Sequence, residues 1–278
     1  LLGIKAHKPI KLPHGFFQFQ GGSDLVRSSI EIGKNLGGGI LGDPIFVLSN
    51  FNKGANYKTD GAAKVPRNWA KAVYEDLLCR ELPALRPTDV GFLISKADNS
   101  PAFRWSKNCL SCHASMDQTA GNLRNIQYIF SGSTRRGVYV LGNVRLKPWS
   151  ISGNSTWSET SLADWSSRKP TGRLFYRSYD GKLIHETTSN IKDLATKVST
   201  KKDFFVCAAK NYYKHFMNID LTLSDSGAPG YKEESPKNRK EIIRLGLNLK
   251  EHQKLRLLMK DIFSSPAYLN GFNAEEGL

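Results

Sequence analysis

Five consecutive residues, Cys109-Leu110-Ser111-Cys112-His113, constrain this chain more than any other feature of its sequence. Two thiols three positions apart can each add across a vinyl group of haem, and the imidazole that follows can then ligate the iron. This C-x-x-C-H pattern is the signature of covalent c-type haem attachment. With four Cys and six His in 278 residues, a shuffled chain would hold the pattern roughly one time in a thousand. The sequence therefore predicts one covalent haem c on Cys109 and Cys112, with His113 as proximal axial ligand.

Three other kinds of site use the same residue types. A closed structural zinc site needs four ligands, but Cys79 and Cys207 stand alone with no second C-x-x-C pair beside them. A thioredoxin-like redox pair would belong to a βαβ unit, which the surrounding sequence does not resemble, and it would give His113 no role. Ordinary disulfide formation with core packing is the remaining alternative.

The motif also predicts the compartment and the state of the other two cysteines. Haem c is attached on the outer side of an energy-conserving membrane, so we expect a periplasmic or otherwise extracytoplasmic location in a bacterium. An oxidising compartment favours a disulfide between Cys79 and Cys207. Two separate buried thiols are the alternative, because unpaired Cys is among the most buried residue types.

The chain is strongly basic, with 40 Lys and Arg against 25 Asp and Glu and a net charge of +15. Such a charge suits an acidic protein, an anionic surface or nucleic acid. The cations are scattered and no nucleic-acid-binding motif accompanies them, so we expect an acidic redox partner or complex subunit and no nucleic acid; a merely solvated surface is the alternative. No apolar run approaches the ~18 residues of a membrane span. Because Leu1 is not an initiator Met, we expect a processed chain or a piece of a longer one.

The pattern of apolar residues predicts mainly α structure with short β hairpins. Trp69, Val73 and Leu77 recur at four-residue spacing within a helix predicted over 66–80, which Pro83 follows. Gly37–Gly42 matches G-x-G-x-x-G formally, but lacks the flanking strand and helix of a nucleotide site, so we expect a turn. The other predicted elements are a helix over 116–124, short strands from 137, a hairpin around Asp180-Gly181, a helix over 203–217, a helix from Ser235-Pro236 that Gly246 ends, and a last helix after Asn248 that buries Leu255, Leu258, Met259 and Ile262.

A set of segments in fixed order adds a resemblance. The motif lies within Asn108–Asp117, which ends in Met-Asp, and is followed by Gly172-Arg173, Asp180-Gly181-Lys182, Asp203–Cys207 and Ile262–Tyr268. Over about residues 37–270 these segments resemble the planctomycete-type cytochrome c proteins, although Gln118 stands where that family usually has proline. The resemblance implies a cytochrome c-like haem domain followed by a small α+β C-terminal domain. The expected division is an arm over 1–20, a haem domain over 21–148, a Trp/Ser-rich connection over 149–170 and a C-terminal helical domain over 171–278.

The sixth iron ligand has several candidates. Met116 would lie on the same side of the ring as His113 in a helix, so we expect it to pack against the macrocycle edge. Met217 and His215, on a predicted aromatic helix, could face a haem, and core packing is the alternative for each. The remaining candidates are Met259, His185, His252, His14 and His7.

These features predict a monohaem c-type cytochrome that carries electrons to or from a protein partner. The alternative is a haem-stabilised structural or assembly subunit of a larger extracytoplasmic complex. A peroxidase-like enzyme would need an open distal iron position, and the sequence offers no recognisable distal motif, so we expect an electron carrier and not an enzyme.

Overall fold

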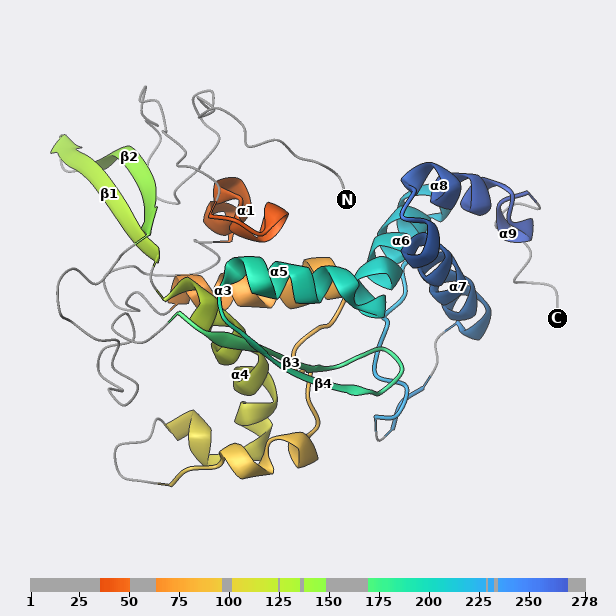
Figure 1. Ribbon diagram of the computed structural model, residues 1–278, viewed down its shortest axis with the longest axis horizontal. Helices are drawn as coiled ribbons and strands as arrows, with labels where there is room; N and C mark the ends of the chain where they lie inside the picture. The colour runs from red at the N-terminus through yellow and green to blue at the C-terminus, as the bar shows by residue number, and fades with distance from the viewer. Residues whose placement is uncertain are drawn as a thin grey trace.

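A computed structural model describes residues 36–50, 64–96, 102–124, 126–135, 138–148, 170–228, 230–232 and 235–269. This part of the chain is mainly helical and contains two separate two-stranded antiparallel sheets (Figure 1), which confirms the predicted class. The elements in chain order are η1 (Gly39–Gly42), α1 (Pro44–Ser49), α3 (Lys64–Ala72), η2 (Val73–Leu77), η3 (Pro87–Asp89), η4 (Gly91–Leu93), η5 (Ala102–Trp105), α4 (Lys107–Ala120), η6 (Gly121–Leu123), β1 (Ile126–Arg135), β2 (Val138–Pro148), β3 (Gly172–Arg177), β4 (Leu183–Thr188), α5 (Ile191–Thr200), α6 (Lys202–Met217), α7 (Pro236–His252), α8 (Leu255–Phe263) and α9 (Pro266–Leu269).

The helix predicted over 66–80 is confirmed as α3 and η2. Trp69 and Val73 are fully buried and Leu77 packs against the same core, so the four-residue stripe is the inward face. The backbone widens to a π-helix in η2 and stops at Cys79, whose φ is +50°. A residue in this left-handed region cannot continue a right-handed helix.

The predicted helix over 116–124 is present, but it does not begin after the motif. The haem motif itself belongs to α4, which begins after an extended Ser106 and runs unbroken to Ala120 before the 3-10 turn η6. No Gly or Pro interrupts the sequence between Lys107 and Ala120. The motif therefore lies on regular helix, where residues three and four apart share a face.

The two hairpins differ in how well the sequence predicts them. The turn signal at Asp180-Gly181 is confirmed: β3 pairs with β4 in antiparallel register, with Phe175 opposite His185. Strand structure after residue 137 is also confirmed as β2, but its partner β1 was not predicted. Ile126, Tyr128 and Phe130 alternate at the start of β1, which is the strand signal that identifies it.

The C-terminal helices confirm the prediction over 203–217 and correct the one that follows. Gly246 was expected to end a helix, but α7 continues through it to His252. A Cβ at Gly246 would lie 2.5 Å from the Cα of Val206 on α6. Gly246 is therefore the point at which α7 packs closely on α6, because only a residue without a side chain fits there.

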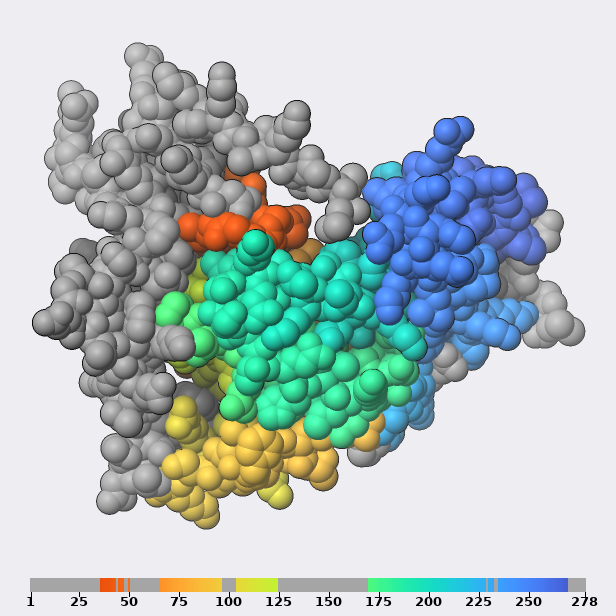
Figure 2. All heavy atoms as spheres, viewed as in Figure 1, coloured from red at the N-terminus to blue at the C-terminus, as the bar shows by residue number. Residues whose placement is uncertain are grey.

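Two large hydrophobic clusters hold the molecule together. The first cluster joins α3, η2, η6, β3 and α5 and includes Trp69, Val73, Leu123, Leu174 and Leu194, in that order of elements. The second lies between α6, α7 and α8. The first cluster thus joins segments from both sides of the predicted connection over 149–170. In Figure 2 the atoms of α5 and the β3–β4 hairpin form one continuous surface with the segment that carries η3 and η4. The predicted arm over 1–20 and residues 149–169 lie outside the described residues.

Substituting Gly246 with alanine is expected to destabilise the protein by about 1–3 kcal/mol, the usual cost of overpacking. The expected sign is informative because alanine within a helix otherwise gains about 1 kcal/mol over glycine. Urea unfolding followed by circular dichroism measures the effect. Leu247→Ala, on the exposed side of the same turn, is the control. A Gly246→Ala protein at least as stable as the wild type would contradict the close contact between α6 and α7.

Candidate functional site

The thiols and the imidazole of the C-x-x-C-H motif form one stripe on α4, called the α4 stripe below. Cys109, Cys112 and His113 stand at positions i, i+3 and i+4 of a regular helix, and these positions share a face. Cys109 is exposed, Cys112 is half-buried, and neither is in a disulfide. Burial raises the pKa of the Cys112 thiol, and neighbouring Ser111 partly offsets this rise. The stripe therefore presents two reduced sulfurs and an imidazole to the same region at the surface.

His113 is held by a carboxylate one turn further along α4. Its Nδ1 lies 3.1 Å from Oδ2 of Asp117. Asp117 in turn accepts two hydrogen bonds from Arg67 of α3, at 2.6 Å from Nε and 3.0 Å from Nη2. Burial acts to raise the pKa of Asp117, but the hydrogen bonds from His113 and Arg67 outweigh it and keep the pKa below its usual value. A carboxylate at Nδ1 orients the ring so that Nε2 is the nitrogen directed to a metal.

Contacts along its length anchor α4 in the core. The hydroxyl of Tyr74 lies 2.7 Å from that of Thr119, and the Thr119 hydroxyl donates to the carbonyl of Arg173 on β3. Burial raises the pKa of Tyr74 to about 12, although its hydrogen bonds to Thr119 and Phe175 act the other way. Leu110 and Ala114 pack in a third, smaller cluster with Phe175. Met116 packs against the first core cluster.

The structure does not bring the two proposed sixth ligands to this stripe. Met217 is 1% exposed within the cluster between α6, α7 and α8. His215 is exposed and lies edge-on to Phe216, with ring centroids 5.0 Å apart. Figure 1 shows the end of α6 beside α8 and well away from α4. Met217 therefore occupies the core position that was the alternative to iron ligation.

The other candidate ligands lie on several elements. His185 is exposed on β4, with its ring 4.3 Å from that of Phe175, which contacts the Leu110–Ala114 side of α4. His252 is exposed at the end of α7, as expected, and Met259 is half-buried on α8. His7 and His14 lie outside the described residues.

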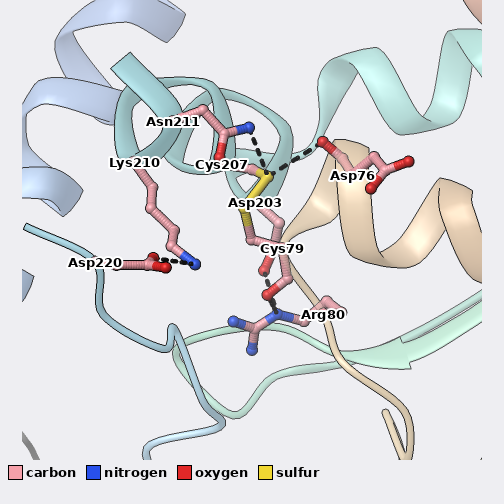
Figure 3. Close-up of a disulfide and its surroundings, with 8 residues drawn as sticks. All are labelled: Asp76, Cys79, Arg80, Asp203, Cys207, Lys210, Asn211 and Asp220. Atoms are coloured by element: carbon pink, nitrogen blue, oxygen red, sulfur yellow. Dashed lines mark hydrogen bonds and ion pairs between the residues drawn. A yellow bond between two sulfur atoms is a disulfide. The ribbon is translucent and has the colours of Figure 1, made fainter. Parts of the chain in front are cut away.

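The predicted disulfide between Cys79 and Cys207 is present (Figure 3) and joins the end of η2 to α6, with Cα atoms 5.2 Å apart. The Cys207 sulfur is 3.5 Å from the carbonyl oxygen of Asp76 and 4.0 Å from the amide nitrogen of Asn211. The next residue, Arg80, is buried and its Nε lies 3.9 Å from the carboxylate of Asp203. The disulfide is thus part of a buried junction between the two main clusters.

Two bidentate ion pairs continue this junction and were not predicted. Arg177 of β3 binds Asp89 at 2.6 and 2.7 Å, and Arg86 binds Asp225 at 2.7 and 2.8 Å. Both pairs join residues 86–89, in and just before η3, to the C-terminal half of the chain. The partners are far apart in the sequence, Asp89 and Arg177 by 88 positions, so no local pattern signals them.

Three carboxylates that pair with arginine, Asp89, Asp117 and Asp225, make stability sensitive to acid. Burial acts to raise the pKa values of Asp89 and Asp225, but hydrogen bonds from their arginine and backbone partners lower them below the usual 3.8, as for Asp117. A group whose pKa is lower in the folded state stabilises the fold above the unfolded pKa and loses this effect as pH falls through the folded one. We expect the free energy of unfolding to fall steeply below about pH 4. Urea titrations at pH 7, 5 and 3 measure this free energy. In Asp89→Asn, the free energy of unfolding should depend less on pH. An equally steep fall in that variant would contradict the contribution of Asp89.

Comparison of the chain with family models, with curated proteins and with solved structures gave no match. Within the residues described above, no helix combines the length and the apolar character needed to cross a membrane. The same residues hold no group of three or more His, Cys, Asp or Glu side chains placed to bind a metal ion on their own. The functional assignment therefore rests on the chemistry of the α4 stripe and its surroundings.

Proposed function

We propose that this chain is a monohaem c-type cytochrome of an extracytoplasmic compartment that exchanges electrons with a protein partner. The observation that carries the proposal is the α4 stripe, where the unpaired thiols of Cys109 and Cys112 share a helical face with His113. The resemblance of Asn108–Asp117 and the later segments to planctomycete-type cytochrome c proteins supports the same assignment.

The donor set fits haem c. Cys109 and Cys112 would each hold the haem through a thioether, formed by addition of the thiol S–H across a vinyl group, which needs no oxidant or reductant. His113 would supply the axial nitrogen. When bound, haem supplies a one-electron iron centre. The protein residues hold this centre: α3 and β3 fix the buried side of α4, and Asp117 fixes the imidazole.

The disulfide supports the proposed location, and the net charge supports a protein partner. The disulfide between Cys79 and Cys207 suits an oxidising compartment. A net charge of +15 speeds encounter with an acidic protein at low ionic strength. We therefore propose a periplasmic or equivalent location and an acidic redox partner.

A structural role within an assembly is the second candidate, and one surface favours it. Phe216, Phe263 and Tyr268 form successive edge-on ring contacts at 4.9 and 5.0 Å across α6, α8 and α9. Tyr268 is 43% exposed and Leu269 is 69% exposed. Contiguous exposed apolar side chains of this kind often mark protein contacts. On this candidate the haem mainly stabilises the fold.

Visible spectra of protein produced with a c-type haem attachment system test the proposal. We expect a Soret band that survives denaturation and a sharp reduced α band that carbon monoxide leaves unchanged, as for a six-coordinate low-spin carrier. A carbon monoxide-sensitive high-spin spectrum would favour a peroxidase-like enzyme, and the absence of a Soret band would reject the haem assignment. Redox titration then separates the two candidates, because an iron centre that no partner reduces or oxidises fits only the structural role.

A further inference from the structure

The carboxylate of Asp117 makes hydrogen bonds with both His113 and Arg67. Its Oδ2 lies 3.1 Å from Nδ1 of His113 and also accepts from Nη2 of Arg67 at 3.0 Å, while Oδ1 accepts from Nε of Arg67 at 2.6 Å. An ionised carboxylate only accepts hydrogen bonds, so Nδ1 of His113 is the donor. The carboxylate of Asp117 and the guanidinium of Arg67 therefore lie in line behind the imidazole of His113, the predicted proximal ligand.

The side chains of His113, Asp117 and Arg67 are partly shielded from solvent, so their electrostatic interactions are only partly screened. The Asp117 side chain is 20% exposed, that of His113 27% and that of Arg67 33%. Charges in a site of reduced dielectric interact more strongly than at an open surface. Asp117 stands four residues after His113, a spacing that keeps the two side chains adjacent on α4. Arg67 reaches the carboxylate from α3, so packing of α3 on α4 sets the geometry.

We infer that Asp117 and Arg67 are positioning residues that set the electron-donating strength of His113, and through it the reduction potential of the haem. The inference deepens the proposed function and rests on it. A carboxylate at Nδ1 draws the ring proton toward itself and increases the electron density at Nε2, which favours the oxidised iron. Arg67 neutralises part of the carboxylate charge and limits this effect. The two residues thus act in opposite directions on the same imidazole.

The direction in which each variant shifts the reduction potential distinguishes an electronic role of Asp117 and Arg67 from a structural one. Arg67→Gln and Asp117→Asn both remove the ion pair that joins α3 to α4, so a structural role would move the potential in the same direction in both variants. An electronic role moves it upward in Asp117→Asn and downward in Arg67→Gln. The pair between Arg86 and Asp225 is a matched control, because it is also bidentate, at 2.7 and 2.8 Å, and Asp225→Asn removes the same charge.

The experiment is a potentiometric titration of the haem-loaded full chain, followed at the reduced α band, for the wild type and the three variants. We expect a higher potential in Asp117→Asn, a lower one in Arg67→Gln and the smallest change in Asp225→Asn. Shifts of Asp117→Asn and Arg67→Gln in the same direction, or an Asp117→Asn shift no larger than that of Asp225→Asn, overturn the inference. If Asp117→Asn does not fold, the Arg67→Gln result decides: a raised or unchanged potential overturns it. A wild type without a Soret band instead rejects the proposed function, so the two failures are distinguishable.

Discussion

Replacing both Cys109 and Cys112 with alanine is expected to abolish covalent haem attachment. The two sulfurs are the only unpaired thiols in the chain, because Cys79 and Cys207 are joined to each other. Without them, any haem that His113 still ligates is held by one axial bond and by packing. Acid–acetone extraction should then release all pigment from the double variant and none from the wild type. On a denaturing gel, haem staining should vanish while the protein band remains.

The single variants give this prediction its control. Cys109→Ala and Cys112→Ala each keep one sulfur and should retain haem through one thioether, with a reduced α band between those of the wild type and of non-covalent haem. His113→Ala keeps both thiols and removes the axial nitrogen, so it separates attachment from ligation. Pigment that stays bound to the denatured double variant would contradict the assignment of these two sulfurs.

Removing the disulfide is expected to lower stability by about 3–5 kcal/mol, since the bridge closes a loop of 128 residues and long loops restrict the unfolded chain most. The melting temperature should fall by roughly 10 °C. The effect has a structural basis as well: Leu78 belongs to the first core cluster, while Cys79 packs against the second. Thermal unfolding of Cys79→Ala/Cys207→Ala followed by circular dichroism measures the loss.

Wild-type protein with its disulfide reduced is the matched control for this variant. It should melt at nearly the same temperature as the double alanine variant, because both lack the same crosslink. Reductant should leave the variant itself unchanged. If the oxidised wild type and the variant melt together, the bridge contributes nothing to stability, and the ion pairs of Asp89 and Asp225 hold the junction without it.

Local features of the sequence predicted the parts of the structure that depend on neighbouring residues. The disulfide follows from counting the two cysteines that lie outside the C-x-x-C-H motif. The stripe of Trp69 and Val73 identified α3 and η2 because helical periodicity is itself local. Asp180-Gly181 identified the hairpin for the same reason.

The features that sequence reasoning missed depend on residues far apart in the chain. Glycine is the residue that most often ends a helix. Only the approach of Val206 from α6 explains why Gly246 lies inside one. Arg67 and Asp117 are 50 positions apart, so nothing near either residue indicates the pair. The i+4 spacing of His113 and Asp117 was the one signal available, and it becomes informative only once the motif is known to be helical.

The disulfide also skips over the haem cysteines, and this order of sulfurs has a consequence for maturation. A chain that enters an oxidising compartment from its N-terminus presents Cys79, Cys109 and Cys112 before Cys207. The first oxidant it meets can therefore join Cys79 to the wrong partner. If haem attaches as we propose, conversion of Cys109 and Cys112 to thioethers removes both competitors; without it, a thiol–disulfide isomerase has to undo the mispaired form. On the proposed function, cofactor loading before oxidation is thus the direct route to the crosslink between Cys79 and Cys207.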